Sequence, residues 1–101
     1  GRQSPAAGQF FLSNMYTVYI LSCTDGSLYT GIAKDLESRL AVHRSGKGAK
    51  YVRARLPITL VYSEKCTDRS AALKREWQIK QFSKEQKQQL ITRLGIDKTS
   101  K

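Results

Sequence analysis

With 101 residues, the chain has room for a single domain with a small hydrophobic core, which excludes a multidomain enzyme. Eighteen Lys and Arg against eight Asp and Glu give a formal net charge of +10, and such a charge attracts polyanions, above all nucleic acid. No apolar run approaches the roughly 18 residues that a membrane span needs, and no signal peptide is recognisable, so we expect a cytoplasmic protein without membrane association.

The chain ends differ in composition from the middle. The first fourteen residues mix Gly, Pro, Ser and Gln, and the only methionine is Met15. We interpret residues 1–14 as an expression leader or disordered tail, residues 15–95 as the folded domain and residues 96–101 as a C-terminal tail. Cys23 and Cys66 lack partners at metal-ligand spacing, so we expect packed or near-surface thiols rather than a zinc site or a disulfide.

Two strands form the start of the predicted domain. Residues 16–23 are mostly β-branched or aromatic, which is typical of a largely buried strand. A turn signal at 24–26 separates them from a second strand at 28–32, so the two segments predict a β-hairpin.

The length of the hairpin loop decides where its tyrosines lie. A two-residue turn would pair Tyr29 with Ser22 and place Tyr19 and Tyr29 on opposite faces. A three-residue loop with Gly26 in a left-handed bulge pairs Tyr29 with Leu21, so that both tyrosines point the same way. We predict the three-residue loop.

A helix and a basic loop follow the hairpin. The helix begins after the N-cap Asp35, has Leu36 and Leu40 as its apolar stripe, and ends at Gly46. Residues 45–55 form a glycine-containing loop rich in Lys and Arg. Flexible backbone, cations and one tyrosine suit contact with a phosphate backbone, although a charged loop that only keeps the protein soluble is the alternative.

The rest of the chain predicts one more strand and two helices. The strand covers residues 58–63, and a helix capped by Thr67 or Asp68 runs to about Phe82. The expected buried side of this helix consists of Ala72, Leu73, Trp77 and Ile79. Ser83 and Gln86 form a capping box for a last helix that ends at Gly95.

The predicted fold is an α+β domain. Its element order is β-β-α-β-α-α, and its three strands form an antiparallel sheet covered by helices.

The motif residues of the hairpin resemble those of the GIY-YIG nuclease superfamily. Val18-Tyr19 is followed ten residues later by Tyr29-Thr30-Gly31. Further matching positions on the two helices are Arg39, His43 and Glu76. The similarity runs from about residue 16 to residue 90 and is greatest to the small, single-domain bacterial group, which shares the Ser-Gly-Lys-Gly-Ala-Lys loop.

The resemblance implies a metal-dependent endonuclease. Glu76 would hold a single Mg²⁺ or Mn²⁺, and one carboxylate is normal for these ions. Arg39 would clamp a phosphate through its guanidinium fork. Tyr19 would act as the base that activates water and Tyr29 would orient or stabilise the reacting groups. An ordinary phenol titrates near pH 10, so Tyr19 can act as a base only if nearby cations stabilise its phenolate.

Several of these residues also have plain structural interpretations. Glu76 could be a partly buried carboxylate paired with a Lys or Arg, Arg39 a solvated surface charge, and Tyr19 and Tyr29 packed strand residues. His43 could carry a proton or hydrogen-bond a tyrosine, or be a structural residue.

The sequence departs from the family pattern at Thr17, at Thr30 and at Ile32, where repair-type relatives have a lysine, and more seriously after the glutamate helix. Many members have an asparagine after the glutamate helix, but the only asparagine here is Asn14. That role is therefore vacant or is taken by Gln81, Lys84 or Gln86.

We expect the substrate to be DNA, or RNA, recognised by backbone and shape rather than by sequence. The residues expected to bind nucleic acid are Lys34, Lys47, Lys50, Tyr51, Arg53 and Arg55. A partner protein is expected to supply targeting. The alternative is a nucleic-acid-binding module that keeps the scaffold without catalysis.

Overall fold

The computed structural model describes residues 15–94 of the chain. The elements, in chain order, are β1 Tyr16–Cys23, β2 Leu28–Ala33, α2 Leu36–Arg44, α3 Lys50–Arg53, β3 Ile58–Cys66, α4 Arg69–Lys80 and α5 Lys84–Leu94. The predicted α+β class and element order are confirmed, with the short helix α3 added. The interpretation of residues 1–14 and 96–101 as tails, and of Gly95 as a helix end, lies outside the described residues.

The three strands form one antiparallel sheet in the order β2-β1-β3. In the hairpin, Leu21 pairs with Tyr29, and Gly26 has a φ of 84°. Cys23 N–H donates to the carbonyl of Ser27 across the loop. The three-residue loop with a left-handed glycine is thereby confirmed, and β2 is an edge strand.

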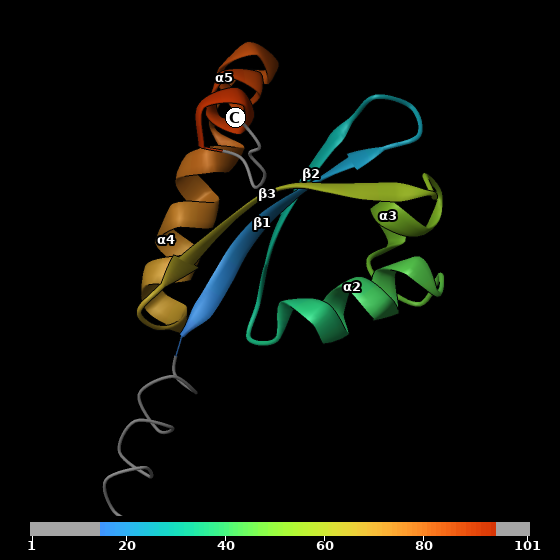
Figure 1. Ribbon diagram of the computed structural model, residues 1–101, viewed down its shortest axis with the longest axis horizontal. Coiled ribbons are helices and arrows are strands. Elements are labelled where there is room, and N and C mark those ends of the chain that lie inside the picture. Colours follow the sequence, from blue (N-terminus) through green and yellow to red (C-terminus); the bar gives the residue numbers. More distant parts are fainter. Residues whose placement is uncertain (1–14, 95–101) are drawn as a thin grey trace, which may run out of the picture.

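Alternation along β1 divides the hydrophobic core into two parts. Tyr19 and Leu21 point to the face covered by α2 and α3, where they pack with Leu40 and Val52. The neighbouring residues of β1 point to the other face. There, Val18, Ile20, Tyr62, Ala72 and Ile79 make the second part of the core under α4 and α5. Figure 1 shows the sheet between these two layers of helices.

Three helices begin with the predicted caps. The Asp35 carboxylate accepts a hydrogen bond from Ser38 N–H at the start of α2. The Asp68 carboxylate accepts one from Ala71 N–H at the start of α4. Ser83 and Gln86 exchange reciprocal bonds of 2.8 and 3.1 Å at the start of α5. Each cap satisfies N–H groups that have no partner within the helix.

The structure corrects the prediction in four places. β3 extends to Cys66, α4 ends at Lys80, and residues 50–53 of the basic loop form α3. The fourth correction concerns the buried side of α4: Leu73 is 38% exposed and Trp77 is 65% exposed. Ala72 and Ile79 are seven positions apart and therefore share one side of the helix, whereas positions 73 and 77 point about 100° or more away from it.

Both cysteines are free, as expected. Among the described residues, no helix combines the length and the apolar character required to cross a membrane.

Candidate active site

Two phenols from neighbouring strands lie on the same face of the sheet. Tyr19 of β1 is 1% exposed, and its ring centroid is 6.4 Å from that of Tyr29 of β2. They share a face because the loop pairs Tyr29 with Leu21, two residues along β1 from Tyr19. The two tyrosines of the motif are therefore brought together.

His43 of α2 completes this aromatic group. Its imidazole is fully buried and meets both phenol rings edge-on, with centroids 5.9 Å from Tyr19 and 5.7 Å from Tyr29. The distance between His43 Nε2 and Tyr19 Oη is 2.9 Å, which is a hydrogen bond. The lone histidine thus hydrogen-bonds a tyrosine, one of the two roles suggested by its position.

Two glycines create the space for these rings. A Cβ added at Gly31 would lie 2.7 Å from Tyr19 Oη and 3.1 Å from Tyr29 Cε2. A Cβ added at Gly48 would overlap the His43 ring, 3.0 Å from Cε1 and still nearer Nδ1. The sequence places Gly48 in the basic loop and gives no signal of its contact with His43.

Gly31 also explains how the phenol reaches the edge of the sheet. Tyr19 pairs with Gly31, and the nearest atoms to the missing Cβ are the hydroxyl end of the Tyr19 ring. The phenol therefore lies across β2, where any larger residue would block it. Since β2 is an edge strand, this brings Tyr19 Oη close to the margin of the sheet.

Glu76 of α4 approaches this margin from the other face. The sheet separates α4 from the phenol rings, but α4 packs against β2 at the edge. The charge of Glu76 contributes to raising the pKa of Tyr19, so the carboxylate lies within electrostatic reach of the phenol. Its side chain is 18% exposed and pairs with Lys80 at 3.1 Å. The ion pair expected under the structural interpretation is thus present on α4.

The protein environment keeps Tyr19 protonated. Burial, and then the neighbouring Tyr29, raise the pKa of Tyr19 to about 12, against a lowering by a hydrogen bond and charge from Arg39. Burial, and then the charge of Arg39, lower the pKa of His43. At neutral pH the pair therefore consists of a neutral phenol and a neutral imidazole.

Arg39 lies one helical turn before His43 and is exposed. Residues four positions apart share a helix face, so Arg39 lies on the side of α2 that faces Tyr19, and its charge lowers the pKa of both His43 and Tyr19. An exposed guanidinium beside a buried phenol can hold a phosphate against that phenol.

The metal-binding side chains near the phenols suit Mg²⁺ or Mn²⁺ better than an ion whose ligands must all come from the protein. Among residues 15–94, no cluster of three or more His, Cys, Asp or Glu could hold an ion. Zinc sites need three or four such ligands, whereas Mg²⁺ commonly uses one or two carboxylates together with waters and substrate oxygens. Glu76 meets that smaller requirement.

The predicted nucleic-acid-binding residues fall into two groups. Lys34, Lys47, Lys50 and Arg53 are exposed and available to a ligand. Tyr51 and Arg55 make contacts within the protein. Tyr51 stacks on Tyr29 with centroids 6.0 Å apart, and the Arg55 guanidinium lies 3.7 Å from the Tyr51 ring centroid.

Arg55 is held at both ends of its guanidinium. Its Nε donates to Asp25 at 3.0 Å, and its Nη1 donates to the carbonyl of Tyr51 at 3.0 Å. This arrangement fastens α3 to the hairpin loop and braces Tyr29 from outside. The pairing of Asp25 with Arg55 has no signal in the sequence, because thirty residues separate them.

Of the candidates for the family asparagine, Gln86 is already used in the cap of α5. Gln81 and Lys84 are exposed.

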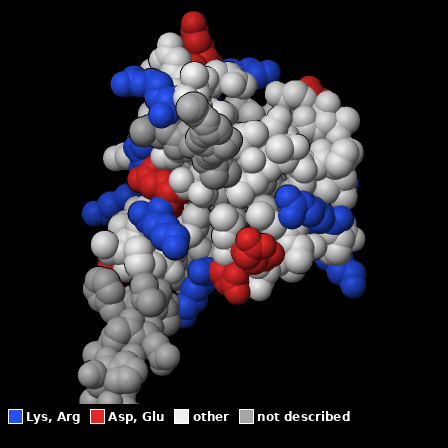
Figure 2. Space-filling model, viewed as in Figure 1, with Lys and Arg blue, Asp and Glu red and all other residues white. Residues whose placement is uncertain are grey.

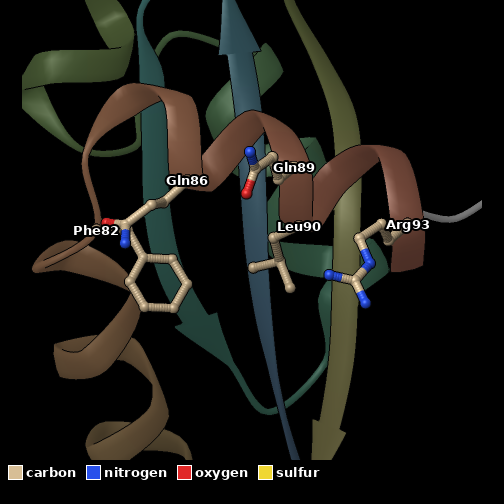
Figure 3. Close-up of a pocket in the computed structure, with 5 residues that line it drawn as sticks. All are labelled: Phe82, Gln86, Gln89, Leu90 and Arg93. Atoms are coloured by element: carbon tan, nitrogen blue, oxygen red, sulfur yellow. The ribbon is translucent and has the colours of Figure 1, made fainter.

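A hollow of about 330 Å³ lies beside α5, lined by Phe82, Gln86, Gln89, Leu90 and Arg93 (Figure 3). It shares no residue with the phenol group, so we do not place the active site there.

The comparison with protein families agrees with this geometry. The model of the GIY-YIG catalytic domain matches residues 15–89. The chain belongs to the GIY-YIG family. That family consists of nucleases, so we consider Tyr19, Tyr29, Arg39 and Glu76 as candidate residues of a nuclease active site.

Similar proteins come from bacteria. A UPF0213 protein of Staphylococcus epidermidis is 54% identical over 74 residues, which cover 73% of this chain and 90% of that protein. The solution structure of a UPF0213 protein from Bacillus halodurans is 42% identical, with a TM-score of 0.52, covering 77% of this chain and 83% of that one. An E. faecalis protein has 40% identity, a TM-score of 0.56 and the same coverage.

Proposed function

We propose that this GIY-YIG protein is a divalent-metal-dependent endonuclease that hydrolyses phosphodiester bonds in DNA, or RNA, by recognising backbone and shape. One observation supports this most. The buried phenol of Tyr19 reaches over Gly31 to a position where His43 hydrogen-bonds it and where Arg39 and Glu76 both affect its pKa. Packing alone does not require a histidine bonded to this hydroxyl group and the charges of an arginine and a carboxylate acting on it.

The tautomer of His43 follows from its surroundings. Nδ1 is buried against Gly48 and has no hydrogen-bond partner among residues 15–94. Buried N–H groups without an acceptor are rarer in proteins than unpaired acceptors. We therefore assign the proton of neutral His43 to Nε2, which donates it to Tyr19 Oη.

With this tautomer, the Tyr19 oxygen accepts a hydrogen bond from His43 and lies near enough to Arg39 for that cation to lower its pKa. The bond from His43 and the attraction to Arg39 both become stronger when the phenol loses its proton, because charge-assisted hydrogen bonds are about twice as strong as neutral ones. The phenol first loses its own proton to solvent, and the Tyr19 phenolate is then the base that takes a proton from the attacking water. Its high pKa in the free protein means that substrate and metal binding must favour the phenolate.

Glu76 would hold the divalent ion, which when bound would neutralise charge developing on the phosphoryl oxygens. The neighbouring cation Lys80 must then give up its ion pair with Glu76. Arg39 positions the phosphate through its exposed guanidinium fork. Tyr29, braced by Tyr51 and Arg55, keeps the reacting group oriented beside Tyr19.

The exposed cations are proposed to contact the strand backbone. They are Lys34, Lys47, Lys50 and Arg53. Such phosphate contacts position a protein on nucleic acid without reading its sequence, so we also propose that a partner protein supplies targeting.

A second candidate is a binding module without catalysis. It is favoured by the Glu76–Lys80 ion pair, which occupies the carboxylate, and by the pKa of about 12 at Tyr19. Incubation of single-stranded, duplex and flapped oligonucleotides with and without Mn²⁺ separates the two. The endonuclease cuts at least one of them only with the ion, and Arg39→Lys, which keeps the charge but loses the fork, cuts it far more slowly. Binding of all substrates without cleavage at any ion concentration would establish the binding module instead.

A further inference from the structure

The most exposed large hydrophobic side chain among the described residues is that of Trp77. It is 65% exposed, and Leu73, one helical turn earlier on α4, is 38% exposed. Trp77 directly follows Glu76 and is the only tryptophan in the sequence. A large apolar ring in solvent beside a candidate metal ligand indicates a binding surface rather than a core residue.

The side of α4 on which Trp77 lies can be deduced from its neighbours. Arg75 and Glu76 flank the buried face of α4 on its two sides. Arg75 Nε donates to Glu64 of β3 at 2.9 Å, so the Arg75 side faces the β3 edge of the sheet. Glu76 is on the opposite side, toward β2 and Tyr19.

Trp77 lies on the same side of α4 as Glu76 but farther from the sheet. It is about 100° around the helix from Glu76 and about 160° from Arg75, and Leu73 lies between Glu76 and Trp77. The indole therefore points to solvent from the Glu76 side of α4, beyond Leu73. A strand whose phosphate is held at Glu76 can follow this side of the helix and bring its next base to the indole.

The charges around Trp77 fit a nucleic acid strand. Lys74 and Lys80 are exposed and lie three positions before and after Trp77, on neighbouring turns of the helix. Figure 2 shows Lys and Arg gathered on the side of the molecule that α4 and α5 form, with fewer acidic side chains among them. An aromatic ring between cations is the arrangement that holds a single strand, because the bases stack on the ring while the cations contact phosphates. A second copy of this chain would bring two such positive surfaces together.

We propose that Trp77 is a stacking platform for an unpaired nucleobase next to the phosphate held at Glu76. This proposal rests on the proposed function and narrows its substrate to single-stranded, flapped or frayed nucleic acid. In an intact duplex the faces of the bases are stacked on each other and cannot reach the indole.

The fluorescence of the single tryptophan reports this contact directly. In the Tyr19→Phe protein with Mn²⁺ present, used to prevent cleavage while leaving Glu76 intact, a single-stranded oligonucleotide is expected to quench the Trp77 emission. A blunt duplex of the same length should quench it much less. A single strand of abasic residues, which keeps the phosphates but lacks the bases, should bind without quenching.

Affinities of labelled oligonucleotides, measured by anisotropy, test the energetic contribution. Trp77→Ala is expected to weaken single-strand binding by about tenfold or more, whereas Trp77→Phe, which keeps a ring, retains most of the affinity. Val42→Ala, which removes an exposed apolar side chain of α2, serves as the matched control and should change little.

Three results would overturn the platform. The first is single-strand binding, seen by anisotropy, without a change in Trp77 emission. The second is equal quenching by duplex and single strand. The third is a change in emission that follows protein concentration alone, which would make the surface a contact between copies of the chain. Quenching by single strands together with inactivity of the wild-type protein would support the platform while removing the endonuclease.

Discussion

Replacing Gly31 by alanine is expected to have a larger effect on kcat than on the free energy of unfolding. The added Cβ would lie 2.7 Å from Tyr19 Oη and 2.8 Å from Cζ, while ordinary contacts begin at about 3.4 Å. The phenol would therefore have to move by about 0.7 Å, in a part of the core where Tyr19 is 1% exposed. Overpacking of this kind typically costs about 1–3 kcal/mol of folding free energy.

The catalytic loss should be larger, because the displaced atom is the reacting one. A shift of this size would disrupt the 2.9 Å hydrogen bond between Tyr19 and His43. A misplacement of about 1 Å can reduce a rate by roughly a hundredfold. We expect kcat to fall by that order while the protein stays folded at the assay temperature.

Gly26→Ala provides the matched control. Gly26 has a φ of 84° and open space around its Cα, so alanine strains the backbone by about 1–2 kcal/mol without touching a phenol. The assay compares single-turnover cleavage with thermal unfolding for both variants. Similar losses of stability with a rate loss only in Gly31→Ala are expected. A Gly31→Ala protein that cleaves at the wild-type rate would refute the reasoning.

Three further predictions concern protons, folding and a helix cap. The pKa of about 12 at Tyr19 in the free protein means that its phenolate fraction increases tenfold per pH unit, so log(kcat/KM), which reports the free protein, should rise with a slope near one from pH 7 to 9. A plateau of kcat/KM near pH 7 would assign the base to another group. Because the folded pKa of His43 is lowered below 6.5, the unfolded chain binds the proton more readily. Stability should therefore fall as pH drops below about 6.5, and denaturant titrations should show less of this loss in His43→Gln. Asp68→Ala should cost about 1 kcal/mol in the same titrations, because Ala71 N–H loses its acceptor; no change would mean that the cap is dispensable.

Local sequence patterns were sufficient to predict the hairpin and the shared face of its tyrosines. Period-two alternation and the Thr-Asp-Gly loop fix the register, and the register alone decides the faces. The cap residues before α2, α4 and α5 were also predictable, because an N-cap acts on N–H groups only two or three positions away.

The features that sequence patterns do not show are contacts between distant segments. Arg55 pairs with Asp25 and covers Tyr51, since folding of the basic loop brings α3 to the hairpin, and its contact with phosphate stays a prediction. Trp77 was assigned to the core by hydrophobicity, although the spacing of Ala72 and Ile79 already defines a buried face that excludes it. No local pattern shows that the Tyr19 phenol crosses β2 at a glycine to reach the side of the sheet edge where α4 lies.

The dependence of cleavage on Mn²⁺ in three proteins tests the metal site most directly. Glu76→Gln keeps the shape of the side chain but loses its charge, whereas Lys80→Gln removes the cation paired with Glu76 at 3.1 Å. Under single-turnover conditions with saturating oligonucleotide, we expect Glu76→Gln to lose activity by at least a hundredfold, and Lys80→Gln to reach half-maximal rate at a lower Mn²⁺ concentration than the wild type. Wild-type cleavage by Glu76→Gln, with an unchanged Mn²⁺ requirement, would contradict the account.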